Sequence, residues 1–338
     1  MSTALRVIAA GPLTTLQDGG RRGWQRFGVA ASGAMDQNAL ALANTLVGNP
    51  WQEGALELTL AGGSFAIEGG AARLALAGAD LGATLDGAPL PSGRSFPLAP
   101  GTRLRLGSAR SGARAYLAVA GGFAASPVFG SVATHLRSGI GGFAGRALAD
   151  GDLLPLKAGA STGTHLALPP DDAAPAHPRV RILPGPQQDY FTAGALETLL
   201  AAEYEITAQA DRMGYRLAGP PLAHAKGFNL ISDAVAAGTI QVPGNRQPIL
   251  LLADRQTTGG YPKIATVISA DLPALGQRRP GDKLRFEAVG LAEATAARRA
   301  LVEWRQRLPS LCVPIEAGFD SERLLGANLI SGVTDGAP

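Results

Sequence analysis

Most of the chain alternates between apolar and polar residues at a period of two. This pattern, typical of half-buried β-strands, occurs in the segments ALELTL, SFAIEG, ARLALAG, RAYLAVAGG, QPILLLAD and KIATVISA. The 45 glycines and 24 prolines among 338 residues favour many short strands joined by tight turns. A regular exchange of strands and helices is missing, which disfavours a doubly wound α/β fold. The pattern therefore predicts a mainly β protein with few helices.

Three segments instead carry apolar residues at helical spacing. In residues 32–48, Ser32 is a plausible N-cap and Gly48 a plausible stop. The other two helices are expected at 191–205 and 291–308. The last one carries glutamate, arginine and glutamine on one face, so we expect it to be a surface helix.

The chain divides at a segment without periodicity, residues 158–178, which is rich in Ala, Pro, Thr and Asp and is typical of a linker. The parts on either side open alike, with RVIAAGPLTTLQD at 6–18 and RVRILPGPQQDYF at 179–191. Both close on a turn followed by an alternating strand, ADGDLLPLK and RPGDKLRFE. We therefore expect four parts: a β domain at 1–157, the linker at 158–178, a second β domain at 179–290, and a C-terminal helix and tail at 291–338.

Charge and residue usage disfavour several classes of function. The net charge is +3, but the basic residues form only short doublets, so no nucleic acid is expected as a partner. Cys312 is the single cysteine and the four histidines lack metal-ligand spacing, so no disulfide and no metal site are predicted. No signal peptide and no run of about 18 apolar residues is visible. We expect a cytoplasmic protein that does not bind a membrane.

The stretch LLADRQTTGGYPKIATVISADL, at 251–272, is the richest in candidate chemistry. Arg255 offers a bidentate fork and Lys263 a point charge for a carboxylate or phosphate. Gln256 can recognise an amide, because its side chain both donates and accepts. The alternative is a rigid loop between two strands, in which Asp254 caps a turn and the glycines supply positive φ.

Other residues could join the same site. Arg212 and Tyr215, in ADRMGYR at 210–216, either converge on it or belong to a surface strand. Gln241 lies in a turn between two strands and could face the site. Ser32 could serve both as a helix cap and as part of an anion-binding helix N-terminus.

Several longer blocks resemble one protein family. They are GPLTTLQDGGRRGWQRFGVAASGAMD at 11–36, GIGGFAGRALADGDLL at 139–154, DRMGYRLAGPPL at 211–222 and GTIQVPGNRQPILLLADRQTTGGYPKIATVISADL at 238–272. In this order they resemble the family of 5-oxoprolinase C subunits, also known as the KipI antagonist, allophanate hydrolase subunit 2 or biotin-dependent carboxyltransferase family. FGSVATHL at 129–136 departs from the expected pattern by lacking an arginine. This departure puts an anion-binding role of that loop in doubt.

The resemblance implies a fold of two cyclophilin-like β-barrel domains in tandem, with a few peripheral helices. It also implies the C subunit of an ATP-dependent 5-oxoprolinase, a hydrolase that opens 5-oxoproline to glutamate and that contains A and KipI-like B subunits as partners. ATP would be used by the complex, and the chain would be inactive alone. Three residues would be catalytic, namely Arg255, Lys263 and Gln256. Eight would bind the small acid or amide substrate: Arg212, Tyr215, Gln241, Asp254, Thr257, Thr258, Tyr261 and Ser32.

Two alternatives remain open at this point. The chain could be half of a biotin-dependent carboxyltransferase that acts on urea or a related small amide. It could also be a non-enzymatic antagonist that binds a KipI-like kinase inhibitor. The many polar groups of the 254–263 loop favour an enzyme, because a protein that only binds a partner gains little from them.

Overall fold

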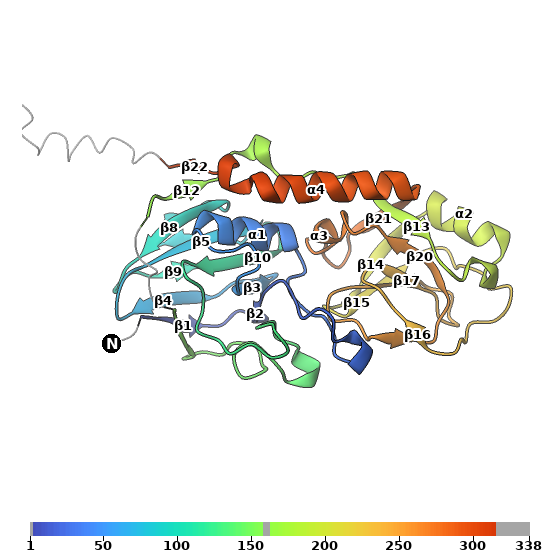
Figure 1. Cartoon of the computed structure of the whole chain (residues 1–338), viewed down its shortest axis with the longest axis horizontal. Coiled ribbons are helices and arrows are strands. Elements are labelled where there is room, and N and C mark those ends of the chain that lie inside the picture. The colour runs from blue at the N-terminus through green and yellow to red at the C-terminus, as the bar shows by residue number, and fades with distance from the viewer. Residues whose placement is uncertain (1–2, 158–162, 316–338) are drawn as a thin grey trace, which may run out of the picture.

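The computed structural model describes residues 3–157 and 163–315. Two β-rich halves lie side by side, and the long helix α4 (Leu291–Leu311) runs along both of them (Figure 1). Four α-helices are present in the described part of the chain. The prediction of a mainly β protein with few helices is confirmed.

The first half contains two sheets around one core. The six-stranded sheet has the order β11 (Leu153–Pro155), β1 (Ala4–Ala9), β4 (Ser64–Glu68), β9 (Leu104–Arg105), β6 (Thr84–Leu85) and β7 (Ala88–Pro89). The seven-stranded sheet has the order β2 (Thr14–Gln17), β3 (Ala55–Thr59), β10 (Ser111–Val119), β5 (Ala72–Asp80), β8 (Arg94–Leu98), β12 (Leu166–Ala167) and β22 (Val313–Pro314).

This half corrects the expectation of a barrel in each domain. The alternating residues Leu5 and Val7 of β1 pack in one core with Leu56 of β3 and Leu74 of β5, so the sheets face each other. The six-stranded sheet ends on strands of two and three residues, β7 and β11. Such short edges offer few hydrogen bonds for closure, and the two sheets remain separate.

The second half is a closed barrel of seven strands. Their order is β13 (Val180–Pro184), β20 (Lys263–Val267), β17 (Thr239–Gln241), β18 (Ile249–Leu251), β15 (Gly214–Ala218), β14 (Glu203–Ala210) and β21 (Lys283–Ala288). Its interior is filled by apolar side chains that include Ile182, Ile206, Leu250 and Phe286. A separate pair, β16 (Asp233–Ala234) and β19 (Thr258–Gly259), lies outside the barrel sheet.

The similar openings and endings of the two halves correspond to paired strands. In the first half β1 pairs with β11, and in the second β13 pairs with β21. The first pair is antiparallel and the second is parallel. The two halves therefore share a local plan but differ in how the last strand returns.

Helix α1 (Gln37–Leu46) begins later than the sequence suggested. Asp36, not Ser32, is the N-cap, and its carboxylate accepts the backbone N–H groups of Asn38 and Ala39 at 2.9 and 3.0 Å. Ser32 has a φ of 52°, which is unsuited to the extended N-cap conformation. Gly48 follows the helix with a φ of 77°, as expected for a stop.

The helix expected at 191–205 is α2 (Ala193–Ala201), and a short helix that was not predicted, α3 (Leu272–Leu275), follows β20. Residues 203–205 belong to β14 instead, because Tyr204 alternates with Ile206 into the barrel core. Tertiary packing thus overrides a local helical preference there.

Helix α4 joins the two halves and is a surface helix with one buried face, as expected. Its inner face buries Ala294, Leu301, Trp304 and Leu308. The segment expected to be a linker contributes β12, which pairs with β8 and with β22 after α4. Among the described residues, no helix is long and apolar enough to cross a bilayer.

Candidate functional site

The polar loop between β18 and β20 sends its side chains to two different hollows. Arg255 lines a cleft between the two halves of the molecule. Gln256 and Tyr261 line a hollow on the outer face of the barrel, together with Gln241 of β17. The predicted site residues therefore do not converge on one cavity.

The hollow on the outer face of the barrel has a volume of about 650 Å³. Gln256 Nε2 lies 3.5 Å from Gln241 Oε1, and Gln241 Nε2 donates to the carbonyl of Tyr261 at 3.4 Å. Both contacts are long, so the two amides can rearrange around a ligand. Asp211 and Arg216 add one charge of each sign. The hollow thus offers amide donors and acceptors beside a guanidinium.

Gly259 is needed for the position of Gln241. A Cβ atom at residue 259 would lie 2.5 Å from Gln241 Nε2. At Gly259 the space beside the backbone is filled by this glutamine. The glycine therefore shapes the hollow indirectly, by making room for one of its amides.

Lys263 is buried under the loop and has a partner. Its Nζ donates to Asp233 Oδ2 at 3.0 Å, and this hydrogen bond is the main reason why the pKa of Asp233 is lowered. Thr258 pairs with Ala234 in the same β16–β19 pair, and the carbonyl of Thr257 accepts the N–H of Val235 at 3.2 Å. Neither threonine lines a hollow in the part of the chain that the structure describes.

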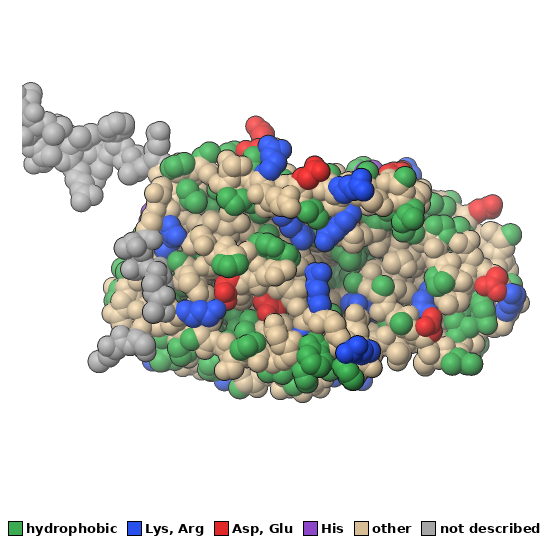
Figure 2. Space-filling model, viewed as in Figure 1, with side chains coloured by type: hydrophobic (Ala, Val, Ile, Leu, Met, Phe, Trp, Pro, Cys, Tyr) green, Lys and Arg blue, Asp and Glu red, His purple; other side chains and the backbone are tan. Residues whose placement is uncertain are grey.

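The cleft between the halves has a volume of about 540 Å³ and is lined by both of them. Ser32 lies on one wall and Arg255 on the other. Arg255 donates to the backbone carbonyls of Val235 and Leu252, both at 3.2 Å, and burial lowers its pKa. Lysine and arginine side chains gather along the junction beneath α4 (Figure 2).

Below this cleft, a buried ionic network joins the halves. Arg212 donates through Nε to Asp254 at 2.8 Å, through Nη1 to Glu57, and through Nη2 to the carbonyl of Gly33 at 2.6 Å. From the other half, Arg114 donates to the hydroxyl of Tyr215 at 3.0 Å. Glu57, Gly33 and Arg114 belong to the first half, whereas the other residues belong to the second.

The charges of this network stabilise one another. Burial alone would lower the pKa of Arg212, but Asp254 and Glu57 outweigh it and raise that pKa. Burial also works against the charged form of Asp254, yet Arg212 and a contact with Ser32 hold the pKa of Asp254 below its usual range. All three guanidinium nitrogens of Arg212 have partners.

This geometry gives Arg212, Tyr215 and Asp254 a structural role. We expected them to bind substrate, but none of the three lines a hollow in the described residues. The Tyr215 hydroxyl donates to the carbonyl of Leu275 at 3.0 Å and is buried. Their residue types correctly indicated polar contacts. Their partners, however, lie in distant segments, so the local sequence pattern does not identify them.

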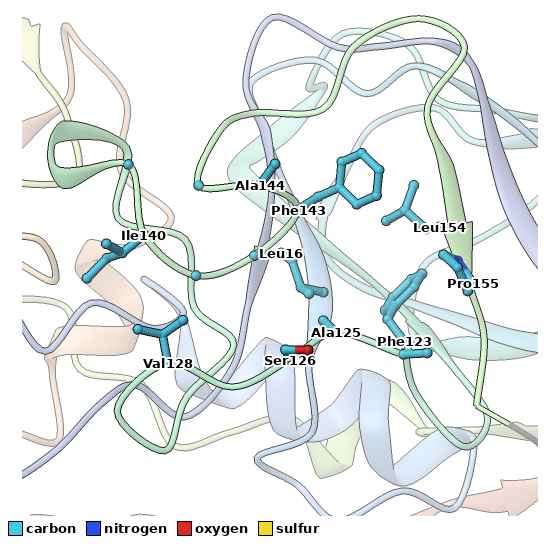
Figure 3. Close-up of a pocket in the computed structure, with 15 residues that line it drawn as sticks. Leu16, Phe123, Ala125, Ser126, Val128, Ile140, Phe143, Ala144, Leu154 and Pro155 are labelled. Atoms are coloured by element: carbon cyan, nitrogen blue, oxygen red, sulfur yellow. The ribbon is translucent and has the colours of Figure 1, made fainter.

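A third hollow, of about 450 Å³, lies within the first half. Phe123, Phe143 and Leu154 lie together at one end of it, and Val128 and Ile140 lie at the other (Figure 3). Among the described residues, no charged side chain lines it. It is therefore poorly suited to a small acid and contains none of the predicted site residues.

Comparisons with known proteins place the chain in a family. A family model described as the carboxyltransferase domain, subdomains A and B, matches residues 27–288. The chain belongs to this family. The 5-oxoprolinase C subunit of Escherichia coli is 41% identical over 296 residues, which cover 87% of this chain and 94% of that protein. The Haemophilus influenzae protein of the same name is 38% identical over 84% of this chain and 91% of its own length.

The carboxyltransferase family also includes larger enzymes. The crystal structure of the Kluyveromyces lactis urea carboxylase superimposes with a TM-score of 0.83 and 28% identity. The match covers 91% of this chain but 29% of that one. The fold described above is thus also found as one part of a longer polypeptide.

Three residues of the cleft were missed by sequence reasoning: Arg22, Arg298 and Arg305. The last two lie seven positions apart on α4, which places them on the same side of the helix. Leu301 and Leu308 of the buried face follow each of them by three residues. This spacing was the available signal that these arginines face inward.

Among residues 3–157 and 163–315, no three histidine, cysteine, aspartate or glutamate side chains are grouped to hold a metal ion.

Proposed function

We propose that the chain is the C subunit of a heteromeric, ATP-dependent 5-oxoprolinase and opens 5-oxoproline to glutamate together with its A and B subunits. One observation carries this proposal: the similarity to two 5-oxoprolinase C subunits extends over 94% and 91% of their lengths. The similarity to urea carboxylase covers 29% of that enzyme. The relatives matched over nearly their whole length are thus 5-oxoprolinase components, whereas the larger enzyme is matched only in part.

The hollow on the outer face of the barrel suits this substrate. 5-Oxoproline has a ring amide, with one N–H donor and one carbonyl acceptor, and a carboxylate. The side-chain amides of Gln256 and Gln241 offer both hydrogen-bond donors and acceptors to the ring amide. Arg216 can pair with the carboxylate. Tyr261 lies at the same opening and is 40% exposed. We assign substrate orientation to these residues.

The three residues expected to be catalytic take different parts in this proposal. Gln256 faces the substrate and can stabilise charge that develops on the amide as it is attacked. Lys263 holds the β16–β19 pair in place through Asp233. Arg255 acts from the other side of the loop, in the cleft between the halves. ATP is used by the assembled complex, and the chain alone is inactive.

The decisive experiment is reconstitution. The chain is mixed with its A and B subunits, ATP and 5-oxoproline, and glutamate release is followed. In Gln256→Ala we expect the KM for 5-oxoproline to rise about tenfold, because an amide that pairs with the substrate is lost. Gln306→Ala, on the exposed side of α4, is the matched control and should leave the KM unchanged.

Two results would overturn parts of this proposal. An unchanged KM in Gln256→Ala would contradict binding of the substrate in the hollow on the outer face of the barrel. A stable complex that forms no glutamate would reject the 5-oxoprolinase assignment itself. The second candidate is then a biotin-dependent carboxyltransferase half, favoured by the TM-score of 0.83 to urea carboxylase. Carboxylation of urea with carboxybiotin tests it.

A further inference from the structure

The cleft between the halves carries charge of one sign. Four arginines line it: Arg22, Arg255, Arg298 and Arg305. No aspartate or glutamate is among its lining residues in the described chain. The arginines come from three separate places in the sequence, namely the loop after β2, the loop after β18, and α4.

These arginines bond only to neutral groups or to none within the described residues. Arg305 donates to Asn38 Oδ1 at 2.7 Å through Nη2 and stacks over the ring of Trp51 at 5.2 Å. Arg255 donates to two backbone carbonyls. Within residues 3–157 and 163–315, none of the four lining arginines is in an ion pair. Their charges are therefore not balanced by a contacting carboxylate in that part of the chain.

The charges also act on one another. Burial lowers the pKa of Arg305 to about 10, and repulsion from Arg298 and Arg22 adds to this effect. The buried carboxylate of Asp36 opposes it but does not line the cleft. A cluster of like charges destabilises a folded protein unless an anion neutralises it.

We propose that this cleft binds a phosphoryl group carried by a small ligand. Guanidinium forks match the oxygens of a phosphate, and four of them favour a multiply charged anion over a single carboxylate. The volume of about 540 Å³ is within the range of small-molecule sites. Leu252, Leu272 and Pro273 provide apolar wall for the rest of the ligand, and Gln25 and Gln37 provide amides.

Helix α4 supplies half of this charge. It lies after residue 288, where the family match ends. Because α4 carries Arg298 and Arg305 along the junction, the site depends on this helix being packed against both halves. Two sources share this chemistry, a nucleotide polyphosphate and a phosphorylated small acid, and the probes below distinguish them.

The test measures binding to the full chain alone, in the absence of 5-oxoproline and of the other components of the complex. Isothermal titration at low ionic strength compares inorganic phosphate, pyrophosphate, ATP and acetate. We expect pyrophosphate and ATP to bind at least about tenfold more tightly than acetate, because they carry more charge. ATP that binds more tightly than pyrophosphate indicates a nucleotide, and equal affinities indicate the phosphoryl group itself.

Matched variants on α4 identify the site. Arg298→Gln and Arg305→Gln should each weaken pyrophosphate binding about tenfold, the loss of one charge-assisted contact. Arg299→Gln and Arg307→Gln remove the same charge from exposed positions of the same helix and should not change it. Thermal melting verifies that each variant is folded, and Arg298→Gln removes a side chain that has no hydrogen bond in the described structure.

Two results would overturn the inference: no binding of any phosphate probe, or equal affinities in all four variants. Neither depends on whether glutamate is formed. A failed binding test with an active complex therefore rejects the phosphoryl site and leaves the proposed function in place. Binding without glutamate formation rejects the function and retains the site.

Discussion

The arginines at the junction of the two halves form two groups that differ in their partners. Arg114 and Arg212 lie in the buried network, where Glu57 and Asp254 balance their charge. Of the cleft arginines, Arg255 contacts backbone carbonyls, and Arg305 contacts an amide and an aromatic ring. Both groups are near the same interface, so burial alone does not distinguish them.

This difference in partners distinguishes arginines that hold the two halves together from arginines that can bind a ligand. The buried guanidinium of Arg212, whose three nitrogens all have partners, cannot recognise a ligand without losing those contacts. A guanidinium that lines a cleft without a carboxylate retains its charge for an anion. We therefore assign the first group to the attachment of the halves and the second to a ligand, and four variants test this division.

Arg212→Ala should have the largest effect on stability. It leaves Glu57 and Asp254 buried without their cation, and we expect a loss of about 3–5 kcal/mol in the free energy of unfolding. Urea denaturation measures it. Arg216→Ala, an exposed position on the adjacent strand β15, should change the value by less than about 0.5 kcal/mol. A loss in Arg212→Ala as small as that of the control would contradict the structural role.

Gln277→Ala should come next. Gln277 Oε1 accepts the backbone N–H groups of Ala113 and Arg114, both at 3.0 Å, and its Nε2 donates to Asp36 at 2.7 Å. The variant leaves these groups without a partner at the junction, at an expected cost of about 2–3 kcal/mol. Thermal and urea unfolding measure it against Gln306→Ala on the exposed side of α4, which should behave like the parent protein.

Asp254 makes the network sensitive to acid. Because its folded pKa is lowered, its contribution is present above the unfolded value of about 4 and is lost as the pH falls through the folded pKa. Asp254→Asn should cost about 2 kcal/mol at pH 7 and flatten the loss of stability below about pH 4. Unfolding measured between neutral and acidic pH tests this. Asp171→Asn, an exposed control, should keep the parent's pH dependence, and parallel curves for parent and Asp254→Asn would refute the prediction.

Arg298→Gln should have the smallest effect on stability, and of opposite sign. It removes a charge that repels Arg305 and has no carboxylate partner among the described residues. We expect a gain of about 0.3–1 kcal/mol at low salt, which disappears at about 0.5 M salt because the repulsion is screened. Arg299→Gln is the control. A clear loss of stability in Arg298→Gln would show that the cleft arginines also hold the structure together.

Most strands, the family and the polar loop could be predicted from the amino-acid sequence. Period-two alternation is a local property of the chain, and it correctly marked the segments of β3, β5, β10 and β20. The resemblance implied a barrel in each half, but in the described chain the second half closes and the first does not, because closure depends on how distant edge strands pair.

The hydrogen-bond and ion-pair partners of the polar residues became clear from the folded structure. Arg212 and Glu57 are 155 positions apart, and Gln277 and Asp36 are 241 apart, so no local pattern links them. The cleft likewise combines Arg22 with Arg298 and Arg305 from the other end of the chain. The sequence shows that an arginine carries a positive charge. Whether a carboxylate neutralises this charge depends on which distant segments lie beside it in the folded protein.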